Sequence, residues 1–289
     1  MKLRPFSTID LPHHHEEEFS TVLLGVDHIK NHAEGKAIEG RNTKSGVKEL
    51  LLRAHNDYFR GFYMDGLTGY ARVLRQEEHH VDAWVGQIRI LVDVGRYEAA
   101  VFWADEVIKR LGEIDVLRYA KAFALAYGGM VEEAKRIINV PVGPDEASYI
   151  WLLRGEVFLR IRINFLQRLF SPHKGIGKVG AFFCFLKALG SHQDDAFLNQ
   201  RIGLAYLQSG DSRRGFEHLA ASLNVVPDNP LTLYGFAECC RMNGDDERAL
   251  YNVKKAIAGN PQLDCAFELL QRMHRPRLRN IMEFFGMKG

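Results

Sequence analysis

The chain has few cysteines and no excess of charge of either sign, and each absence excludes a class of protein. Its four cysteines form no CxxC pair and are too sparse for a disulfide scaffold, so we expect reduced, buried thiols at Cys184, Cys239, Cys240 and Cys265. The 38 Lys and Arg residues nearly balance the 36 Asp and Glu residues. No global electric field therefore favours nucleic acid or a membrane as the partner.

Long hydrophobic runs are also missing. Residues 1–19 contain no apolar segment suited to a signal peptide, and no later stretch reaches the roughly 18 uncharged residues that a membrane-spanning helix needs. We therefore expect a cytoplasmic protein.

Motifs for catalysis and for metal binding are absent as well. The sequence has no phosphate-binding glycine loop and no nucleophile motif. Consecutive histidines, as in residues 13–18 and in the pair His79 and His80, diverge on a helix instead of converging on an ion. Paired aspartates at positions 194–195 and 245–246 fall beside predicted turns, where Asp caps helices. We predict a non-catalytic protein with no cofactor and no metal site.

Five glycines, by contrast, recur along the chain with a fixed interval. Gly61, Gly95, Gly129, Gly210 and Gly244 are separated by 34, 34, 81 and 34 residues, and a Gly or Ala follows each of them five positions later. A 34-residue period is typical of stacked helical hairpins, each too thin to bury its own apolar face. This period predicts a repeat array.

Small and aromatic residues keep the same register within the intervals. The Trp position of the first helix holds Trp84 and Trp151, and small residues recur on both helices: Ala54, Ala122, Gly155, Gly203 and Ala237 on the first, Ala100, Ala134, Ala181 and Ala249 on the second. This pattern resembles the tetratricopeptide repeat family. The resemblance implies an all-α fold, a right-handed superhelix (α-solenoid) of tandem helical hairpins that binds other proteins.

We predict six repeats over residues 47–263, with a helical extension before them and a capping helix after them. The units are residues 47–80, 81–114, 115–147, 148–195, 196–229 and 230–263. The 81-residue interval places an insertion at about residues 160–177 of the fourth unit. Residues 264–289 are predicted to form the C-terminal cap and a tail.

Residues 1–46 lie outside this register. Their polar start is predicted to be disordered. Phe19, Val22, Val26 and Ile29 then recur at helical spacing, which predicts a helix at about residues 17–35. This helix either caps the array or folds back into its groove as an internal ligand.

By resemblance to the family, the first helices line a concave groove that holds a peptide or amphipathic helix of the partner. Its predicted lining is Phe59, Arg89, Tyr119, Phe123, Tyr127, Tyr149, Leu152, Glu156, Arg160, Gln200, Leu204, Tyr234, Glu238 and Arg241. Tyr119, Phe123 and Tyr127 are four residues apart and share one helix face, which predicts an aromatic centre. Arg89 and Arg160 at its border favour a partner with some acidic character. The alternative is that the three rings pack against neighbouring helices.

The inserted unit has its own composition. Residues 157–193 contain six basic residues, six phenylalanines and no Asp or Glu. Basic residues interleaved with apolar ones bind phosphates or anionic lipids, which predicts a second contact at Arg162, Arg168 and Lys174. The alternative is that the phenylalanines enter the core while the cations stay solvated.

These patterns favour a scaffold or adaptor whose partner is another protein. A chaperone for a secreted substrate would use the same groove, and an adaptor for RNA or an anionic membrane surface would use the basic insertion. A homo-oligomer through the end faces of the array is a further prediction.

Overall fold

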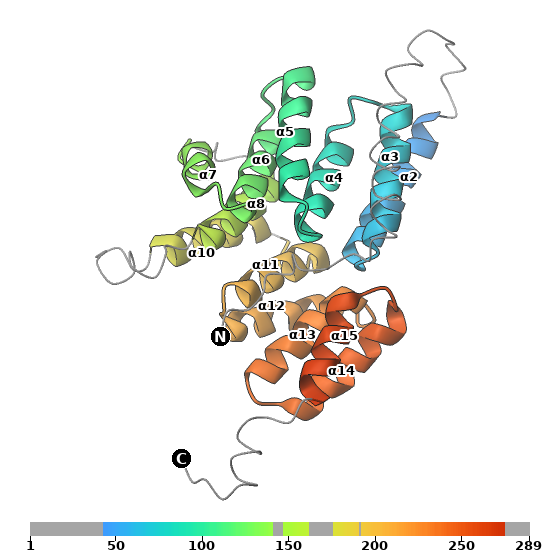
Figure 1. Ribbon diagram of the computed structural model, residues 1–289, viewed down its shortest axis with the longest axis vertical. Helices are drawn as coiled ribbons and strands as arrows, with labels where there is room; N and C mark the ends of the chain where they lie inside the picture. Colours follow the sequence, from blue (N-terminus) through green and yellow to red (C-terminus); the bar gives the residue numbers. More distant parts are fainter. Residues whose placement is uncertain (1–42, 141–146, 162–175, 191, 275–289) are drawn as a thin grey trace, which may run out of the picture.

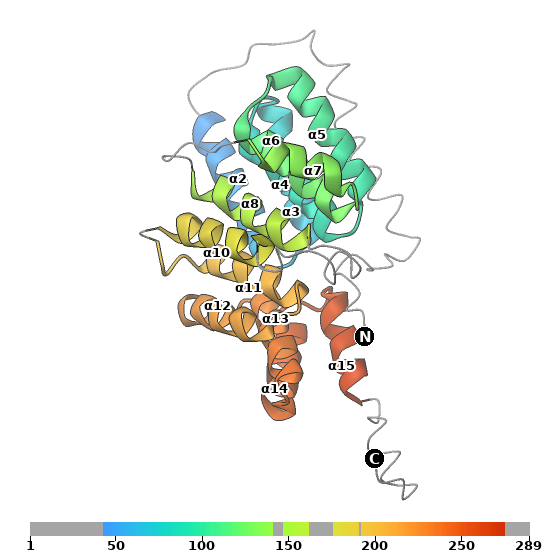
Figure 2. The same cartoon turned by 90° about the vertical axis from the view of Figure 1, so that its left-hand side faces the viewer.

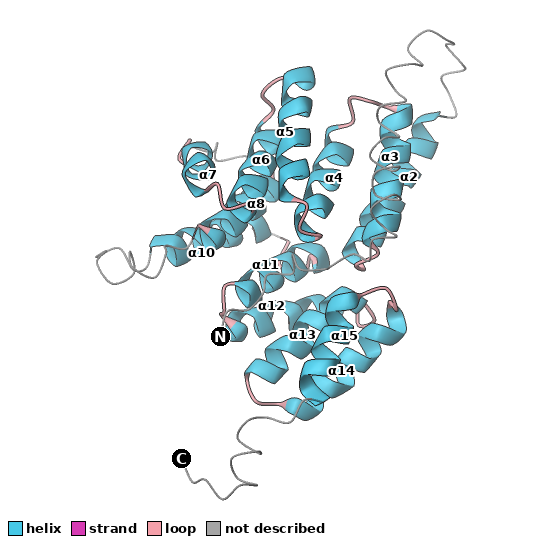
Figure 3. Cartoon of the chain, in the orientation of Figure 1, coloured by secondary structure: helices cyan, strands magenta, loops and turns pink. Residues whose placement is uncertain are grey.

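The structure is a computed structural model that describes residues 43–140, 147–161, 176–190 and 192–274. Every regular element in these residues is a helix, which confirms the all-α prediction (Figure 3). The predicted helix at 17–35, the insertion residues Arg162, Arg168 and Lys174, and the tail after residue 274 lie outside the described residues.

The helices form pairs along the chain, followed by one last helix (Figure 1). Their bounds are α2 Thr43–Phe59 with α3 Tyr63–Gln76, α4 Val81–Asp93 with α5 Tyr97–Leu111, α6 Asp115–Tyr127 with α7 Val131–Ile138, α8 Ser148–Arg160 with α10 Ile176–Leu189, α11 Ala196–Gln208 with α12 Ser212–Val225, α13 Pro230–Met242 with α14 Asp246–Gly259, and α15 Asp264–His274.

The recurring glycines form the turns inside the pairs. All five have φ between 80° and 88°, a left-handed conformation that favours glycine. At the second turn, the N–H of Gly95 donates to the Val92 carbonyl over 3.0 Å and that of Arg96 to the Leu91 carbonyl over 2.7 Å. These bonds satisfy the last carbonyls of α4 and end the helix.

Polar caps begin several of the later helices. The side chains of Asp195, Asp211, Asn229 and Asp245 each accept a backbone N–H three residues further on. Asp195 and Asp245, two members of the predicted turn aspartates, therefore cap helices. The four cysteines are free and buried, as expected.

Small residues let neighbouring helices approach closely. A Cβ atom on Gly86 of α4 would lie 2.3 Å from the Tyr70 ring of α3, and one on Gly155 of α8 would lie 2.4 Å from the Phe185 ring of α10. Both rings are almost completely buried. A bulky side chain from a second helix thus fills the space beside each of these two glycines.

The first helices contact one another in series, from α2 through α4, α6, α8, α11 and α13 to α15, and the second helices pack against them from outside (Figures 1 and 2). This is the arrangement expected of a helical-hairpin solenoid. The first helices therefore form the inner side of the array.

The array also closes on itself. The carbonyl oxygen of Phe59, at the end of α2, accepts hydrogen bonds from Gln200 Nε2 over 2.8 Å and from Asn229 Nδ2 over 3.0 Å. A Cβ on Gly61 would lie 3.2 Å from Leu263 and 3.3 Å from Leu231. We call this meeting of the α2–α3 turn with α11, α13 and residue 263 the closing contact. It brings the first helix pair against the fifth and sixth.

Candidate binding site on the inner side of the array

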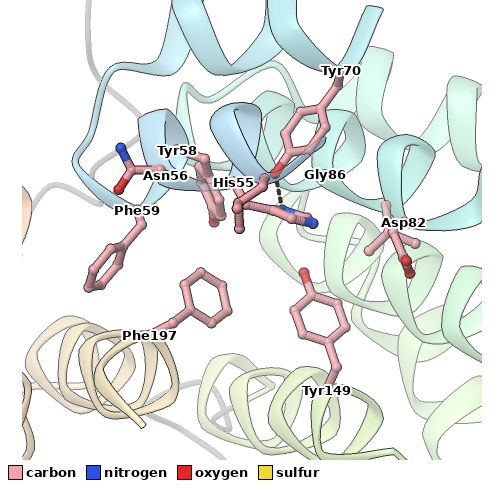
Figure 4. A pocket seen from close by; sticks show the side chains of 11 residues that line it. His55, Asn56, Tyr58, Phe59, Tyr70, Asp82, Gly86, Tyr149 and Phe197 are labelled. Atoms are coloured by element: carbon pink, nitrogen blue, oxygen red, sulfur yellow. Dashed lines mark hydrogen bonds between the residues drawn. The ribbon is translucent and has the colours of Figure 1, made fainter. Parts of the chain in front are cut away.

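A pocket of about 510 Å³ opens between α2, α4, α8 and α11 (Figure 4). The lining residues come from helices that are far apart in the sequence, with α2 on one side and α8 and α11 on the other. The lining residues are Leu52, His55, Asn56, Tyr58, Phe59, Tyr70, Asp82, Val85, Gly86, Tyr149 and Phe197. Six of these side chains are aromatic rings, counting His55, and none is Lys or Arg. The pocket is therefore suited to apolar side chains.

Phe197 of α11 is the centre of the aromatic lining. Its ring centroid lies 6.1 Å from those of Tyr58 and Phe59, and 6.4 Å from that of Tyr149, with which it stacks at an angle of 18°. Figure 4 shows Phe59 and Phe197 facing each other across the space between α2 and α11. Rings at these separations form a continuous apolar surface with fixed geometry.

The opposite wall is built around a hydrogen bond between two rings. His55 Nδ1 lies 2.6 Å from the Tyr70 hydroxyl, which Figure 4 shows as a dashed line. Tyr70 reaches the pocket from α3 because Gly86 leaves room for its ring. Burial lowers the pKa of His55, and Asp82 partly offsets this effect. This wall thus presents an imidazole and a phenol hydroxyl beside an apolar surface.

Tyr58 of the pocket also joins four buried charged residues in a cluster that we call the inner charge network: Tyr58, Arg89, Asp93, Glu156 and Arg201. Arg201 donates to both Asp93 oxygens over 2.8 and 3.1 Å, and Arg89 Nη2 donates to Glu156 Oε1 over 2.8 Å. Arg201 Nη2 reaches the same Glu156 oxygen over 3.3 Å, and the Tyr58 hydroxyl donates to Asp93 over 2.7 Å. The network joins α2, α4, α8 and α11.

The network keeps its charges because they are paired. Burial by itself lowers the pKa of Arg89, but the Glu156 carboxylate and nearby tyrosine hydroxyls raise it overall well above the ordinary value. Burial opposes the charge of Arg201 too, but its pKa rises overall, chiefly through Asp93. Burial also raises the pKa of Tyr58 far above its usual range, so its hydroxyl stays protonated and can donate to Asp93.

The structure places most of the predicted groove residues inside the array rather than along an open surface. Ten are buried: Arg89, Tyr119, Phe123, Tyr127, Leu152, Glu156, Gln200, Leu204, Tyr234 and Glu238. The other four are partly exposed: Phe59, Tyr149, Arg160 and Arg241. Only Phe59 and Tyr149 line the pocket. Of these ten residues, Gln200 belongs to the closing contact, since it donates to the Phe59 carbonyl.

The three aromatic residues of α6 pack as the alternative interpretation expected. Tyr119 is 1% exposed and Phe123 0%, and the Tyr127 hydroxyl donates to Gln208 over 2.7 Å. Arg89 lies 4.8 Å from the centre of the Phe123 ring, and Arg160 lies 5.0 Å from that of Tyr127. Arg89 forms a buried ion pair with Glu156. Its charge therefore does not favour an acidic partner, contrary to the expectation from the sequence.

Several pocket residues were missed by the sequence analysis although the repeat register could have indicated them. Asp82 and Phe197 are the second residues of their units, the position that Tyr149 holds in the fourth unit. Tyr70 gave no such signal, because it lies on a second helix and reaches the pocket only past Gly86. Among the described residues no group of three His, Cys, Asp or Glu side chains could hold a metal ion. Within the same residues, no helix is both long and apolar enough to cross a membrane.

Comparison with known proteins agrees with the fold. Residues 51–112 match a family model described as tetratricopeptide repeat. This match and the helix pairs repeated along the described chain support a tetratricopeptide repeat fold.

Among curated proteins, the chain is similar to the photosystem I assembly protein Ycf3 of two strains of Prochlorococcus marinus. It is 36% identical to the protein of strain NATL1A and 35% identical to that of strain NATL2A, in each case over 103 residues. The match covers 34% of this chain and 56% of the relative, so the chain spans about half the length of these relatives.

Among solved structures, the chain resembles a tetratricopeptide repeat protein from Parabacteroides merdae, with 14% identity, a TM-score of 0.46 and coverage of 79% of this chain and 86% of that one. It also resembles a tetratricopeptide repeat protein from Thermus thermophilus, with 17% identity, a TM-score of 0.40 and coverage of 78% of this chain and 97% of that one.

Proposed function

We propose that the chain is a non-catalytic scaffold or adaptor that holds a peptide or an amphipathic helix of a partner protein in the pocket between α2, α4, α8 and α11. The tetratricopeptide repeat fold supports a role in protein–protein interaction. The observation that carries the finer proposal is the aromatic pocket, since most of the inner surface predicted to bind is buried.

The chemistry of the lining favours apolar anchor residues on the partner. A volume of about 510 Å³ is large enough for one or two bulky side chains. The aromatic rings supply contact area, and the polar groups of His55, Asn56 and Asp82 supply hydrogen-bonding partners beside it. A helix with two apolar residues one turn apart meets these requirements.

Leu52 allows a direct test because it lines the pocket and is 67% exposed. We propose to place a photo-crosslinking amino acid at Asn56, irradiate the full chain in native lysate, and map the crosslinked segment of the partner. The matching synthetic peptide should bind the wild type, and Leu52→Asp should weaken this binding at least tenfold because it puts a charge at an apolar contact.

Tyr251→Asp provides the matched control. Tyr251 is 63% exposed on α14, which contributes nothing to the pocket. Equal peptide affinity for Leu52→Asp and Tyr251→Asp, with both variants folded by circular dichroism, would exclude the pocket as the binding site.

A role in assembling a protein complex is a second candidate, favoured by the similarity to Ycf3 proteins, which are described as photosystem I assembly proteins. An assembly factor releases its partner when the complex forms, whereas a scaffold keeps it. Pulse–chase labelling followed by affinity capture of the chain distinguishes these roles, because only an assembly factor loses its labelled partner during the chase.

The N-terminal segment is a competing occupant of the pocket. Its predicted helix at about residues 17–35 has an apolar stripe, and the segment leads directly into α2, which supplies five pocket residues. If this helix fills the pocket, deletion of residues 1–40 should raise peptide affinity. If it is a structural cap, the deletion should lower solubility and leave affinity unchanged.

A further inference from the structure

The outward face of α10 is apolar. Phe182, Phe183 and Leu186 are 47%, 53% and 49% exposed. The inward face of the same helix is apolar too, because Cys184 and Phe185 are buried. A helix with apolar residues on both sides is typical of a helix that is covered on both sides.

No other second helix that the structure describes shows three such exposed residues together. The outward faces of the neighbouring repeats carry charge instead, with Glu132, Glu133 and Arg136 on α7 and with Arg213 and Glu217 on α12. Charged outward faces are ordinary for solvated helices. The face of α10 therefore departs from the pattern of its own array, and contiguous exposed apolar residues mark an interaction surface.

Two cations border this face. Lys187 Nζ lies 5.8 Å from the centre of the Phe183 ring, and the Arg214 guanidinium of α12 lies 5.7 Å from that of the Phe182 ring. Arg214 also lies 3.6 Å from Asp211, which offsets part of its charge. Residues 157–193 contain six basic residues, Lys187 among them, and no Asp or Glu, and Asp194 and Asp195 follow directly.

We propose that this α10 face, made of Phe182, Phe183, Leu186 and Lys187, docks on the surface of an anionic lipid membrane. The apolar side chains enter the boundary between headgroups and acyl chains, while Lys187 extends to the lipid phosphates. Juxtaposed apolar and basic residues give a peripheral attachment that requires both kinds of contact.

The charge pattern favours an anionic surface over a second copy of the chain. A two-fold pairing of the α10 face with itself would gather Lys187 and Arg214 of both copies at one interface. Like charges facing each other oppose association. An anionic lipid surface instead complements these cations and accepts the exposed rings.

The test is sedimentation of the full chain with vesicles of phosphatidylcholine alone and of phosphatidylcholine with about 30% phosphatidylserine. We expect binding to the anionic vesicles at about 50 mM salt and at least threefold weaker binding at about 300 mM. Phe182→Ser with Phe183→Ser should reduce this binding at least tenfold, and Lys187→Glu should reduce it severalfold.

Phe102→Ser is the matched control, because Phe102 is 57% exposed on α5 and lies away from α10. It should bind vesicles like the wild type. Equal binding by the Phe182 and Phe183 double variant would overturn the proposal, and so would equal binding to both kinds of vesicle. Failure of the wild type to bind vesicles, with a sedimentation coefficient lowered by the double substitution, would identify a protein–protein surface instead. If the double variant does not fold by circular dichroism, Lys187→Glu decides: unchanged vesicle binding overturns the proposal.

Discussion

Glu156 lies at the centre of the inner charge network. One of its oxygens accepts from both Arg89 and Arg201, and its side chain is 1% exposed. Buried charges are stabilised only by their partners, so removing one partner leaves the others uncompensated in a medium of low polarity. The second oxygen, Oε2, has no hydrogen-bond partner among the described residues, so the network is not fully satisfied.

We predict that Glu156→Ala lowers the free energy of unfolding by about 3–5 kcal/mol, because Arg89 then loses its ion-pair partner and Arg201 keeps only Asp93. Urea unfolding measures this loss. Arg213→Ala is the control, since Arg213 is 90% exposed beside Glu217 and should change stability by less than about 0.5 kcal/mol. The double variant Arg89→Met with Glu156→Met should be more stable than Glu156→Ala. A loss below about 1 kcal/mol for Glu156→Ala would contradict the network as described.

His218 makes a pH-dependent contribution to the free energy of unfolding. Its Nδ1 lies 2.9 Å from Asn199 Oδ1, and because the Asn199 amide donates to the carbonyls of Gln193 and Asp195, its oxygen must be an acceptor. His218 Nδ1 therefore carries a proton. Burial lowers the pKa of His218 below the ordinary 6.5; Glu217 opposes this and Arg214 adds to it.

We predict that the free energy of unfolding falls as the pH drops below 6.5, since the unfolded state then binds the proton more readily than the folded state. Above pH 6.5 the contribution of His218 is complete. Unfolding at neutral and mildly acidic pH should show a smaller decrease for His218→Gln than for the wild type. An NMR titration midpoint of His218 above 6.5 would refute the prediction.

At the scale of helices, close approach depends on small residues opposite large ones. Gly86 faces the Tyr70 ring, whereas a Cβ atom on Gly46 of α2 would have no neighbouring atom within 4 Å. The two positions form a natural comparison, because both glycines lie inside helices and only one is in contact.

We predict that Gly86→Ala destabilises the chain by about 1–3 kcal/mol, because the Tyr70 ring must move and its hydrogen bond with His55 is lost. Gly46→Ala should instead raise stability by about 0.5–1 kcal/mol through the better helix propensity of alanine. Thermal unfolding measures both effects. Equal changes in both variants would show that the Gly86–Tyr70 contact is unimportant for helix packing.

Many of the helices and turns could be predicted from the sequence. The glycine period indicated the turns, and the repeat register that holds Trp84 indicated α4, because both depend on residues close together in the chain. The exposure of Phe182 and Phe183 could not be predicted, since spacing along a helix identifies a face without showing what covers it. Of the phenylalanines expected in the core, Phe185 is buried and these two are not.

At the scale of the whole molecule, the closing contact joins the first helix pair to the fifth and sixth. Asn229 has two roles there: its Oδ1 accepts the N–H of Thr232 and caps α13, and its Nδ2 donates to the Phe59 carbonyl. Gln200 donates to the same carbonyl. The contact therefore depends on side-chain amides that can be changed without removing the cap.

We predict that Asn229→Asp with Gln200→Ala opens the array, because aspartate keeps the cap but turns an acceptor towards the Phe59 carbonyl, which loses both donors. Spin labels at Arg72 of α3 and Lys254 of α14, both exposed, should move apart, and the radius of gyration from solution scattering should increase. Asp245→Asn is the control, since Asp245 caps α14 without a bond to Phe59. Unchanged label distances would mean that apolar packing around Gly61 is sufficient for closure.

The sequence by itself determined the repeat class, the helical pairs and their turns, because these follow from local spacing, glycine conformation and capping. It also identified Phe59 and Tyr149 as inner residues, since both lie on first helices. Only the tertiary structure decided that Arg89 and Glu156 pair in the interior. Closure of the array depends on contacts between residues more than 140 positions apart, such as that of Phe59 with Gln200, and no local pattern encodes such a distance.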